Sequence, residues 1–160
     1  FLRAPEPLIQ KNFSRIMSLK DGKNKMSKSD PSDLSRINLT DNNDQIVNKI
    51  KKAKTDNDPL PGDAKNLNTR PEVENLLGIY SSLIGQSLTN SINEFSGKNF
   101  LEFKKKLADL VVEKISPISK EINKLQKDTS YIDKILKEGA NKANFIASRK
   151  VEEMKKIIGF

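Results

Sequence analysis

Two lysines and two serines lie close together in a polar stretch of the chain. They form the string Lys25-Met26-Ser27-Lys28-Ser29, which is followed by Asp30-Pro31. An ammonium group is a compact charge with three donors, which suits phosphate oxygens whose geometry changes during a reaction. Hydroxyls and loop amides add further donors. The string therefore predicts a loop that closes over a triphosphate and neutralises charge on a departing pyrophosphate. The alternative is an ordinary solvated loop in a chain rich in Lys and Ser.

The residue types that are missing limit the chemistry. The 160 residues include no Cys and no His, which excludes disulfides, thiol nucleophiles, His general bases and metal sites built from these residues. The formal net charge is +8, from 29 basic and 21 acidic residues. This surplus favours a polyanionic partner such as RNA. Because 24 of the basic residues are Lys, a biased genome composition is an alternative source of part of this charge.

Irregular structure and a short strand are expected to position the Lys25–Ser29 loop. Three prolines, at positions 5, 7 and 31, oppose helix formation within residues 1–42. Residues 13–19 alternate loosely between apolar and polar side chains, as a short strand does. Asp21-Gly22 then signals a turn, and residues 23–32 are polar apart from Met26.

The rest of the sequence has the apolar periodicity of helices. A first helix is predicted over residues 41–54 and is followed by a loop over residues 55–70. A second helix begins at Pro71 and stops at Gly85, and a third runs from a cap at Ser87 to Phe95. A fourth begins at Phe100 and breaks or kinks at Pro117, and a last helix begins at about Ser130. Small residues in the middle of the last helix allow a neighbour to approach closely. Phe100 and Phe103 lie on an apolar stripe and are expected in the core. The fold class is therefore mainly α, a helical bundle preceded by a short α/β segment.

The loop and its surroundings resemble one protein family. Lys-Met-Ser-Lys-Ser is the second signature of class I aminoacyl-tRNA synthetases, and the flanking segments are similar in order and spacing to the tryptophanyl-tRNA synthetase family of bacterial and organellar type. The similar segments are Pro5-Glu6-Pro7-Leu8-Ile9, Arg15-Ile16-Met17-Ser18-Leu19-Lys20-Asp21-Gly22, Ile50-Lys51-Lys52-Ala53-Lys54-Thr55-Asp56, Asn75-Leu76-Leu77-Gly78-Ile79-Tyr80, Gly85-Gln86-Ser87, Phe103-Lys104-Lys105 and Ile135-Leu136-Lys137-Glu138-Gly139-Ala140. The resemblance covers nearly the whole chain.

The resemblance implies a division of the chain near residue 40. Residues 1–40 would be the C-terminal remnant of a Rossmann-type α/β catalytic domain that carries the Lys25–Ser29 loop. Residues 41–160 would be a helical domain of the anticodon-binding type. The last helix is a candidate to pack back on the catalytic part.

The resemblance also implies roles for single residues. Lys25 and Lys28 would be catalytic and contact the phosphates of ATP, with Lys28 stabilising the departure of pyrophosphate. Ser27 and Ser29 would join them in binding ATP. Ile16 is expected near the adenine through its backbone, and Met26 would pack against the adenine ring. Ordinary packing is the alternative for Ile16 and Met26. Mg²⁺ is expected to arrive with ATP, and no residue is assigned as a metal ligand.

The implied activity is that of a tryptophan–tRNA ligase, with this chain as its C-terminal part. Tryptophan, ATP and tRNA(Trp) are the expected partners, and the family works as a homodimer. The first signature of class I synthetases contains His, so a chain without His is expected to lack part of the active site and to be inactive alone. No apolar run approaches the ~20 residues that cross a bilayer, so no membrane partner is expected, and the location would be the cytoplasm or an organellar matrix.

Three alternatives remain open from the sequence. The first is a relative of the tyrosyl-tRNA synthetase, which shares the fold. The second is a basic helical module that binds RNA without catalysis. The third is an interaction scaffold whose basic surface is incidental.

Overall fold

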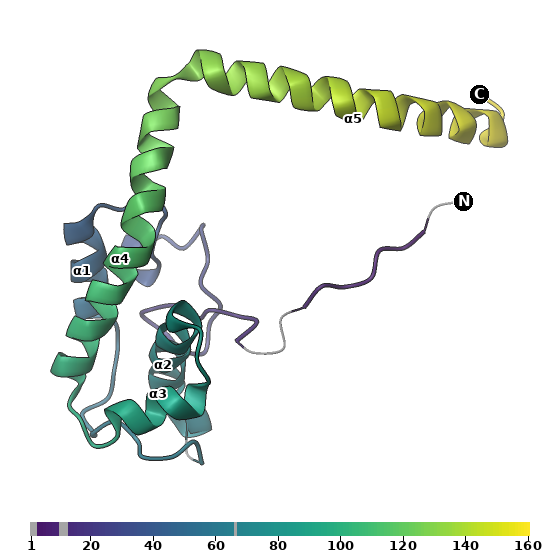
Figure 1. Ribbon diagram of the computed structural model, residues 1–160. Coiled ribbons are helices and arrows are strands. Elements are labelled where there is room, and N and C mark those ends of the chain that lie inside the picture. Colours follow the sequence, from purple (N-terminus) through teal and green to yellow (C-terminus); the bar gives the residue numbers. More distant parts are fainter. Residues whose placement is uncertain (1–2, 10–12, 66) are drawn as a thin grey trace. The chain divides into compact units, whose positions relative to one another are not determined.

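The computed structural model describes residues 3–9, 13–65 and 67–160 (Figure 1). The elements are α1 (Asn43–Lys52), α2 (Pro71–Ile84), α3 (Leu88–Phe95), α4 (Phe100–Lys127) and α5 (Thr129–Ile158), with 3₁₀ turns at Asp33–Ser35 and Leu67–Thr69. No strand occurs within these described ranges. The predicted mainly α fold is therefore confirmed.

The chain divides into two compact units, residues 1–119 and residues 120–160. The first unit holds α1, α2, α3 and most of α4, and the second holds the end of α4 together with α5. The division near residue 40 that the resemblance implies stays a prediction. Its first segment includes residues 1–2 and 10–12, which lie outside the described residues.

The core of the first unit is built from apolar side chains of four helices and two loops. Three aromatic rings meet edge to face at its centre, since the Phe95 ring centroid lies 4.9 Å from that of Tyr80 and 4.8 Å from that of Phe103. Such pairs stabilise beyond the area they bury. Phe103 is fully buried, which confirms the prediction that it lies in the core. Phe100 is only partly buried and packs against the core from outside. The fully buried apolar side chains are Leu19, Ile46, Ile50, Val73, Leu76, Leu77, Ile92, Phe95, Phe103 and Leu107.

Local sequence explains where the helices begin and end. The Asn42 side chain caps α1 and forms a reciprocal capping box with Gln45. Pro71 occupies the first turn of α2, where its missing N–H costs nothing, and Gly85 ends that helix with φ of 71°. The Ser87 side chain accepts a hydrogen bond from the Asn90 amide and caps α3. The predicted bounds of α2 and α3 are confirmed.

Helices α1 and α4 run antiparallel within the first unit (Figure 1). The Lys104 Nζ, near the start of α4, donates to the Ala53 carbonyl at the end of α1 at 2.6 Å. The Ser116 hydroxyl, further along α4, bonds to Asn43 at the beginning of α1. Two polar contacts at opposite ends therefore fix the register of this helix pair.

Of the break or kink predicted at Pro117, the break into two helices is wrong, and the kink stays a prediction. The helix is continuous from Phe100 to Lys127 with Pro117 inside it. Proline removes the hydrogen bond to the carbonyl four residues earlier, which here belongs to the exposed Glu113. Water can satisfy a carbonyl at an exposed position, so the helix continues.

The prediction of a short strand within residues 13–19 is also wrong for the described residues. The segment forms one isolated antiparallel bridge, between Met17 and Lys25. A strand needs a partner over several residues, and the backbone of Met17 is instead held by a side chain of α2, described below.

Helix α5 has no buried residue. Its apolar side chains remain open to solvent over the whole length, with Tyr131, Ile135, Leu136, Phe145, Ile146, Val151, Met154, Ile157 and Ile158 all exposed. An added Cβ at Gly139 would meet nothing within 4 Å. The close neighbour and the packing on the catalytic part that the sequence suggests for this helix stay predictions. None of the described helices is both long and apolar enough to cross a membrane.

Candidate phosphate-binding loop and helical groove

A tight turn presents the Lys25–Ser29 loop. The Ser18 amide donates to the Asn24 carbonyl at 2.8 Å, and the Met26 amide donates to the Ile16 carbonyl at 3.0 Å. These two bonds flank the Met17–Lys25 bridge. Two of the predicted ATP-binding positions, Ile16 and Met26, are therefore brought side by side by the backbone.

Asp21 closes this turn. Its carboxylate accepts from the Lys23 amide at 3.0 Å and from the side chain of Asn24. The hydrogen bond from the Lys23 amide is the main reason that the pKa of Asp21 lies below its ordinary value. The neighbouring Gly22 is buried against the first turn of α2, where an added Cβ would lie 2.5 Å from backbone atoms of Pro71 and Glu72. Only glycine allows the turn to approach α2 this closely.

The loop itself combines internal hydrogen bonds with free cations. The Ser27 and Ser29 hydroxyls lie 3.1 Å apart, and the Ser29 amide donates to the Ser27 hydroxyl. Lys25 and Lys28 are exposed, and neither ammonium group forms an ion pair with any residue that the structure describes. Met26 is half-buried and packs against the core. The loop thus has an apolar anchor in the core and two charges directed to solvent.

Arg36 fixes the far end of the loop. Its Nη1 donates to the Asp30 carbonyl at 2.8 Å and to the Ser32 carbonyl at 3.3 Å. The Asp30 side chain in turn accepts from the Ser32 amide at 2.7 Å. Both ends of the Lys25–Ser29 loop are therefore held, which pre-organises the segment between them.

Asn75 is a positioning residue that the sequence analysis missed. It is buried in α2, where its amide donates to the Met17 carbonyl at 2.8 Å and its carbonyl accepts from the Met17 amide at 2.8 Å. This side chain replaces the neighbouring strand that residues 13–19 lack. No local pattern indicates this role, because Asn75 lies on the side of α2 opposite to the stripe that contains Val73 and Leu77. It is buried there because both of its polar groups are hydrogen-bonded.

A buried lysine also links the segment after the loop to α1. Lys49 Nζ lies 2.7 Å from a carboxylate oxygen of Asp41 and 2.7 Å from one of Asp33. Lys49 and Asp41 are 2% and 5% exposed, so each charge depends on the other for solvation. The hydrogen bond from Lys49 holds the pKa of Asp33 below its ordinary value. The signal available in the sequence was that Lys49 follows Ile46 by three residues and precedes Ala53 by four, which places it on the buried face of α1.

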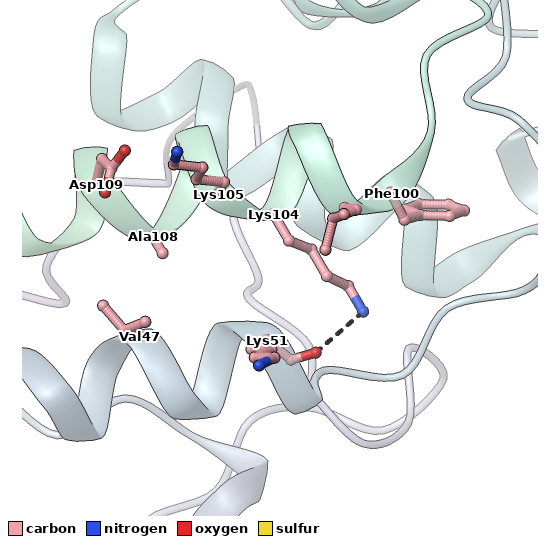
Figure 2. Close-up of a pocket in the computed structure, with 8 residues that line it drawn as sticks. Val47, Lys51, Phe100, Lys104, Lys105, Ala108 and Asp109 are labelled. Carbon is pink, nitrogen blue, oxygen red and sulfur yellow. Dashed lines mark hydrogen bonds between the residues drawn. The ribbon is translucent and has the colours of Figure 1, made fainter.

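A second feature of the first unit is an open groove between α1 and α4 (Figure 2). It has a volume of about 650 Å³ and is lined by Val47, Lys51, Phe100, Leu101, Lys104, Lys105, Ala108 and Asp109. Its walls are mainly apolar, while three of the lining residues are lysines. No local pattern in the sequence indicates this groove, because its two walls come from separate segments, residues 47–51 and residues 100–109.

Lys104 has a structural role in this groove. Its ammonium group donates to the Ala53 carbonyl at 2.6 Å and to the Thr55 hydroxyl at 3.1 Å. It therefore satisfies carbonyls left open at the C-terminal end of α1, where a positive charge is favourable. Burial lowers its pKa from the ordinary value. Lys104 also lies 6.0 Å from the centroid of the Phe100 ring, and Arg70 lies 5.9 Å from the same centroid.

Two ion pairs support the loop that connects α1 to α2. Arg70 makes two hydrogen bonds to the carboxylate of Asp56, at 2.6 and 2.7 Å, which lower the pKa of Asp56. The Lys54 ammonium lies 2.8 Å from Glu72 and lowers the pKa of that carboxyl group through its hydrogen bond.

No group of three or more Asp or Glu side chains suited to a metal ion occurs among the residues that the structure describes.

Curated tryptophan–tRNA ligases are similar to almost the whole chain. The ligase of Rhizobium meliloti is 52% identical over 155 residues, covering 97% of this chain and 44% of the relative. That of Mesorhizobium japonicum is 48% identical over 159 residues, covering 99% of this chain and 45% of the relative. The solved tryptophanyl-tRNA synthetase of Mycoplasma pneumoniae is 27% identical, with a TM-score of 0.75 over 94% of this chain and 45% of that structure. The chain thus spans less than half the length of the curated relatives it matches.

The family assignment rests on the sequence as a whole. The family model described as tRNA synthetases class I (W and Y) matches residues 1–145, which include the Lys25–Ser29 loop, Asn75, Lys49 and both walls of the groove. The predicted resemblance to the C-terminal portion of tryptophanyl-tRNA synthetases is confirmed by this match and by the relatives. The chain therefore belongs to the class I tRNA synthetases of the W and Y group.

Proposed function

We propose that this chain is part of a tryptophan–tRNA ligase and supplies its ATP-phosphate loop and tRNA-binding helices. The observation that carries the proposal is the pair Lys25 and Lys28, exposed and without ion-pair partners in the described structure, on a loop whose two ends are fixed. Free ammonium groups on a pre-organised loop are suited to bind phosphates.

The proposed reaction has two steps. A carboxylate oxygen of tryptophan attacks the α-phosphorus of ATP, and the bond from that phosphorus to the bridging oxygen breaks, giving the adenylate and pyrophosphate. A ribose hydroxyl at the end of tRNA(Trp) then attacks the acyl carbon and AMP leaves. Negative charge builds on the departing pyrophosphate in the first step, which is where Lys28 is proposed to act.

The neighbouring residues support binding of the rest of ATP. Ile16 and Met26 form an antiparallel backbone pair beside the loop, so an adenine there would contact the backbone of Ile16 and the side chain of Met26. Ser27 and Ser29 would add hydroxyl donors. Mg²⁺ bound with ATP would share the neutralisation of phosphate charge, and we assign it no protein ligand in this chain.

The helical part is proposed to bind tRNA. Residues 98–160 carry 15 basic and 9 acidic side chains, and a basic surface attracts a phosphate backbone. Residues 1–40 would then belong to the catalytic domain and residues 41–160 to the anticodon-binding domain. We propose a homodimer in the cytoplasm or an organellar matrix as the working form.

The test is exchange of labelled pyrophosphate into ATP in the presence of tryptophan. We expect no exchange from the 160 residues alone. Exchange should appear when they replace the matching 44% of the Rhizobium meliloti ligase, to which they are 52% identical. In that chimera, Lys28→Ala should slow exchange about 100- to 1,000-fold, the range for loss of one charge-stabilising group, with little change in tRNA affinity.

Lys23→Ala is the matched control, because Lys23 is also exposed and lies in the preceding turn. The control should retain exchange. Equal exchange by the Lys28→Ala chimera and its parent would refute the role proposed for Lys28. A folded chimera without any exchange would count against the proposed activity as a whole.

A further inference from the structure

We propose that Asn75 is a positioning residue for the ATP site. From α2 it holds the backbone of Met17, so that the Lys25–Ser29 loop and the backbone of Ile16 keep the places in which ATP would bind. This inference rests on the proposed function, because it takes the loop to bind ATP.

Met17 directs its own polar backbone groups toward α2. Met17 and Lys25 form the bridge between the two arms of the turn, and the hydrogen bonds of that bridge belong to the residues on either side of them. In such a pair the amide and carbonyl groups of the bridged residue point away from its partner. Those of Met17 meet the Asn75 side chain, whose carbonyl accepts from the Met17 amide and whose amide donates to the Met17 carbonyl, both at 2.8 Å.

These two bonds set the planes of two peptide units. The Met17 amide and the Ile16 carbonyl belong to one planar unit and point in opposite directions, as do the Met17 carbonyl and the Ser18 amide. The Ile16 carbonyl accepts from the Met26 amide at 3.0 Å. The Ser18 amide donates to the Asn24 carbonyl at 2.8 Å. One side chain thus orients both peptide groups that bond to the loop on the two sides of its first lysine.

A carboxamide side chain has both groups that this position needs. It carries an acceptor oxygen and a donor nitrogen, and Met17 offers one donor and one acceptor. An ionised carboxylate can only accept, and an apolar side chain of the same size can do neither. Asn75 is 2% exposed and follows the first turn of α2, against which Gly22 is packed. The residue type and its burial therefore favour a role in orienting the loop.

The two ends of the loop are held by different residues. Asn75 holds the end before Lys25, whereas Arg36 holds the far end through two backbone carbonyls. Loss of the Asn75 bonds therefore frees the end that carries Lys25 and the proposed adenine contacts, and it leaves the far end in place. Binding of ATP should weaken, while binding of tryptophan, to which no residue of this chain is assigned, should not.

The test is pyrophosphate exchange in the chimera with the Rhizobium meliloti ligase, measured as a function of ATP concentration and of tryptophan concentration. Asn75→Leu keeps the size of the side chain and removes both hydrogen bonds. It should raise KM for ATP and lower kcat/KM for ATP about 100-fold, the effect of misplacing a reacting group by about 1 Å, and leave KM for tryptophan within about twofold of the parent.

Two control variants on α2 separate positioning from stability. Ser81→Ala removes a buried hydroxyl whose hydrogen bonds go to carbonyls of its own helix. Leu77→Ala opens a cavity in the core on the other side of α2, and it should lower the melting temperature at least as much as Asn75→Leu, because it empties a fully buried site. Both controls should keep kcat/KM for ATP close to that of the parent.

Asn75→Asp tests the two hydrogen bonds directly. An ionised carboxylate accepts from the Met17 amide but repels the Met17 carbonyl, whereas the protonated form has one donor and one acceptor, as asparagine has. Exchange relative to the parent should therefore rise as the pH falls from about 8 to about 6, because burial raises the pKa of a carboxyl group toward this range. The charged side chains that line the cavity beside this position, Arg15 and Glu74, are common to the parent and the variant, so the ratio isolates the new carboxyl group.

The outcomes separate this inference from the proposed function. A parent chimera without exchange refutes the proposed function, and this inference with it. If the parent is active but Asn75→Leu lowers kcat/KM for ATP no more than Leu77→Ala does, the proposed function stands and Asn75 is not a positioning residue. An equal rise of KM for tryptophan and for ATP would show a general loss of structure and overturn the inference. If Asn75→Leu does not fold, Asn75→Asp decides, because a ratio to the parent that stays constant with pH overturns the inference as well.

Discussion

At the scale of residues, two glycines of the same chain have opposite surroundings. Gly22 is pressed against the backbone of Pro71 and Glu72, whereas Gly139 lies in the exposed middle of α5 with no atom near its missing Cβ. Sequence alone suggests a turn at the first and a close neighbour at the second. The difference arises from tertiary packing, which no local pattern records.

The first prediction compares alanine at these two positions. Gly22→Ala should destabilise the first unit by about 1–3 kcal/mol, because the backbone of α2 must move away from the new methyl group. Gly139→Ala should stabilise α5 by about 0.5–1 kcal/mol, because alanine loses less backbone freedom in a helix. Urea unfolding followed by circular dichroism measures both. Equal effects at the two positions would contradict the packing described for Gly22.

At the scale of elements, the triad of Lys49, Asp41 and Asp33 connects the 3₁₀ turn after the Lys25–Ser29 loop to α1. No pattern in the sequence indicates that these two segments are in contact. If the proposed function is correct, the position of the phosphate loop depends on α1 through Lys49.

The second prediction is that Lys49→Met lowers the free energy of unfolding by about 3–5 kcal/mol, because it leaves the buried carboxylate of Asp41 without a counter-charge. Lys49→Met/Asp41→Asn should recover part of this loss. Lys52→Met is the control, since Lys52 is exposed on the same helix, and it should change stability by less than about 0.5 kcal/mol. Chemical denaturation gives the values. A double variant no more stable than the single one would argue against the ion pair as the cause.

The helices themselves were largely predictable, because their signals are local. Pro71, Gly85 and Ser87 mark the ends of α2 and α3 through their own backbone and capping chemistry, and the apolar stripes identify the core faces. The continuity of α4 was not predictable from Pro117 alone, because it depends on whether water reaches one carbonyl. The loop lysines were found from sequence, but Asn75, Lys49 and the groove were not, since each depends on contacts between distant segments.

At the scale of the whole molecule, charge is distributed between paired and free groups. The carboxyl groups of Asp33, Asp56 and Glu72 are each paired with a basic side chain. Lys25 and Lys28 are without ion pairs in the described structure, and they lie on the loop where we propose that the phosphates of ATP bind.

The third prediction concerns pH. The paired carboxyl groups have pKa values lowered in the folded state, so the unfolded chain binds more protons at these sites. Their contribution to stability is complete above about pH 4.5, the upper end of the ordinary values, and is lost as the pH falls through the lowered ones. Thermal unfolding between pH 6 and pH 2 should show this decline.

Asp56→Asn should make the decline shallower, because one of the lowered groups is removed. Asp63→Asn is the control, since among the described residues the Asp63 side chain accepts only a local hydrogen bond, from the Lys65 amide. Equal slopes for the parent and for Asp56→Asn would show that the pair with Arg70 does not contribute to acid stability.

The bond from Lys104 to the end of α1 has a consequence for how the chain acquires its structure. Helix α1 has 10 residues, fewer than an isolated helix needs to be stable in water. Its last turn is completed by a side chain 51 residues further along the chain. During synthesis, α1 therefore emerges from the ribosome long before the group that completes it. It stays a fluctuating segment until α4 follows, so that the first unit folds as one cooperative event rather than helix by helix.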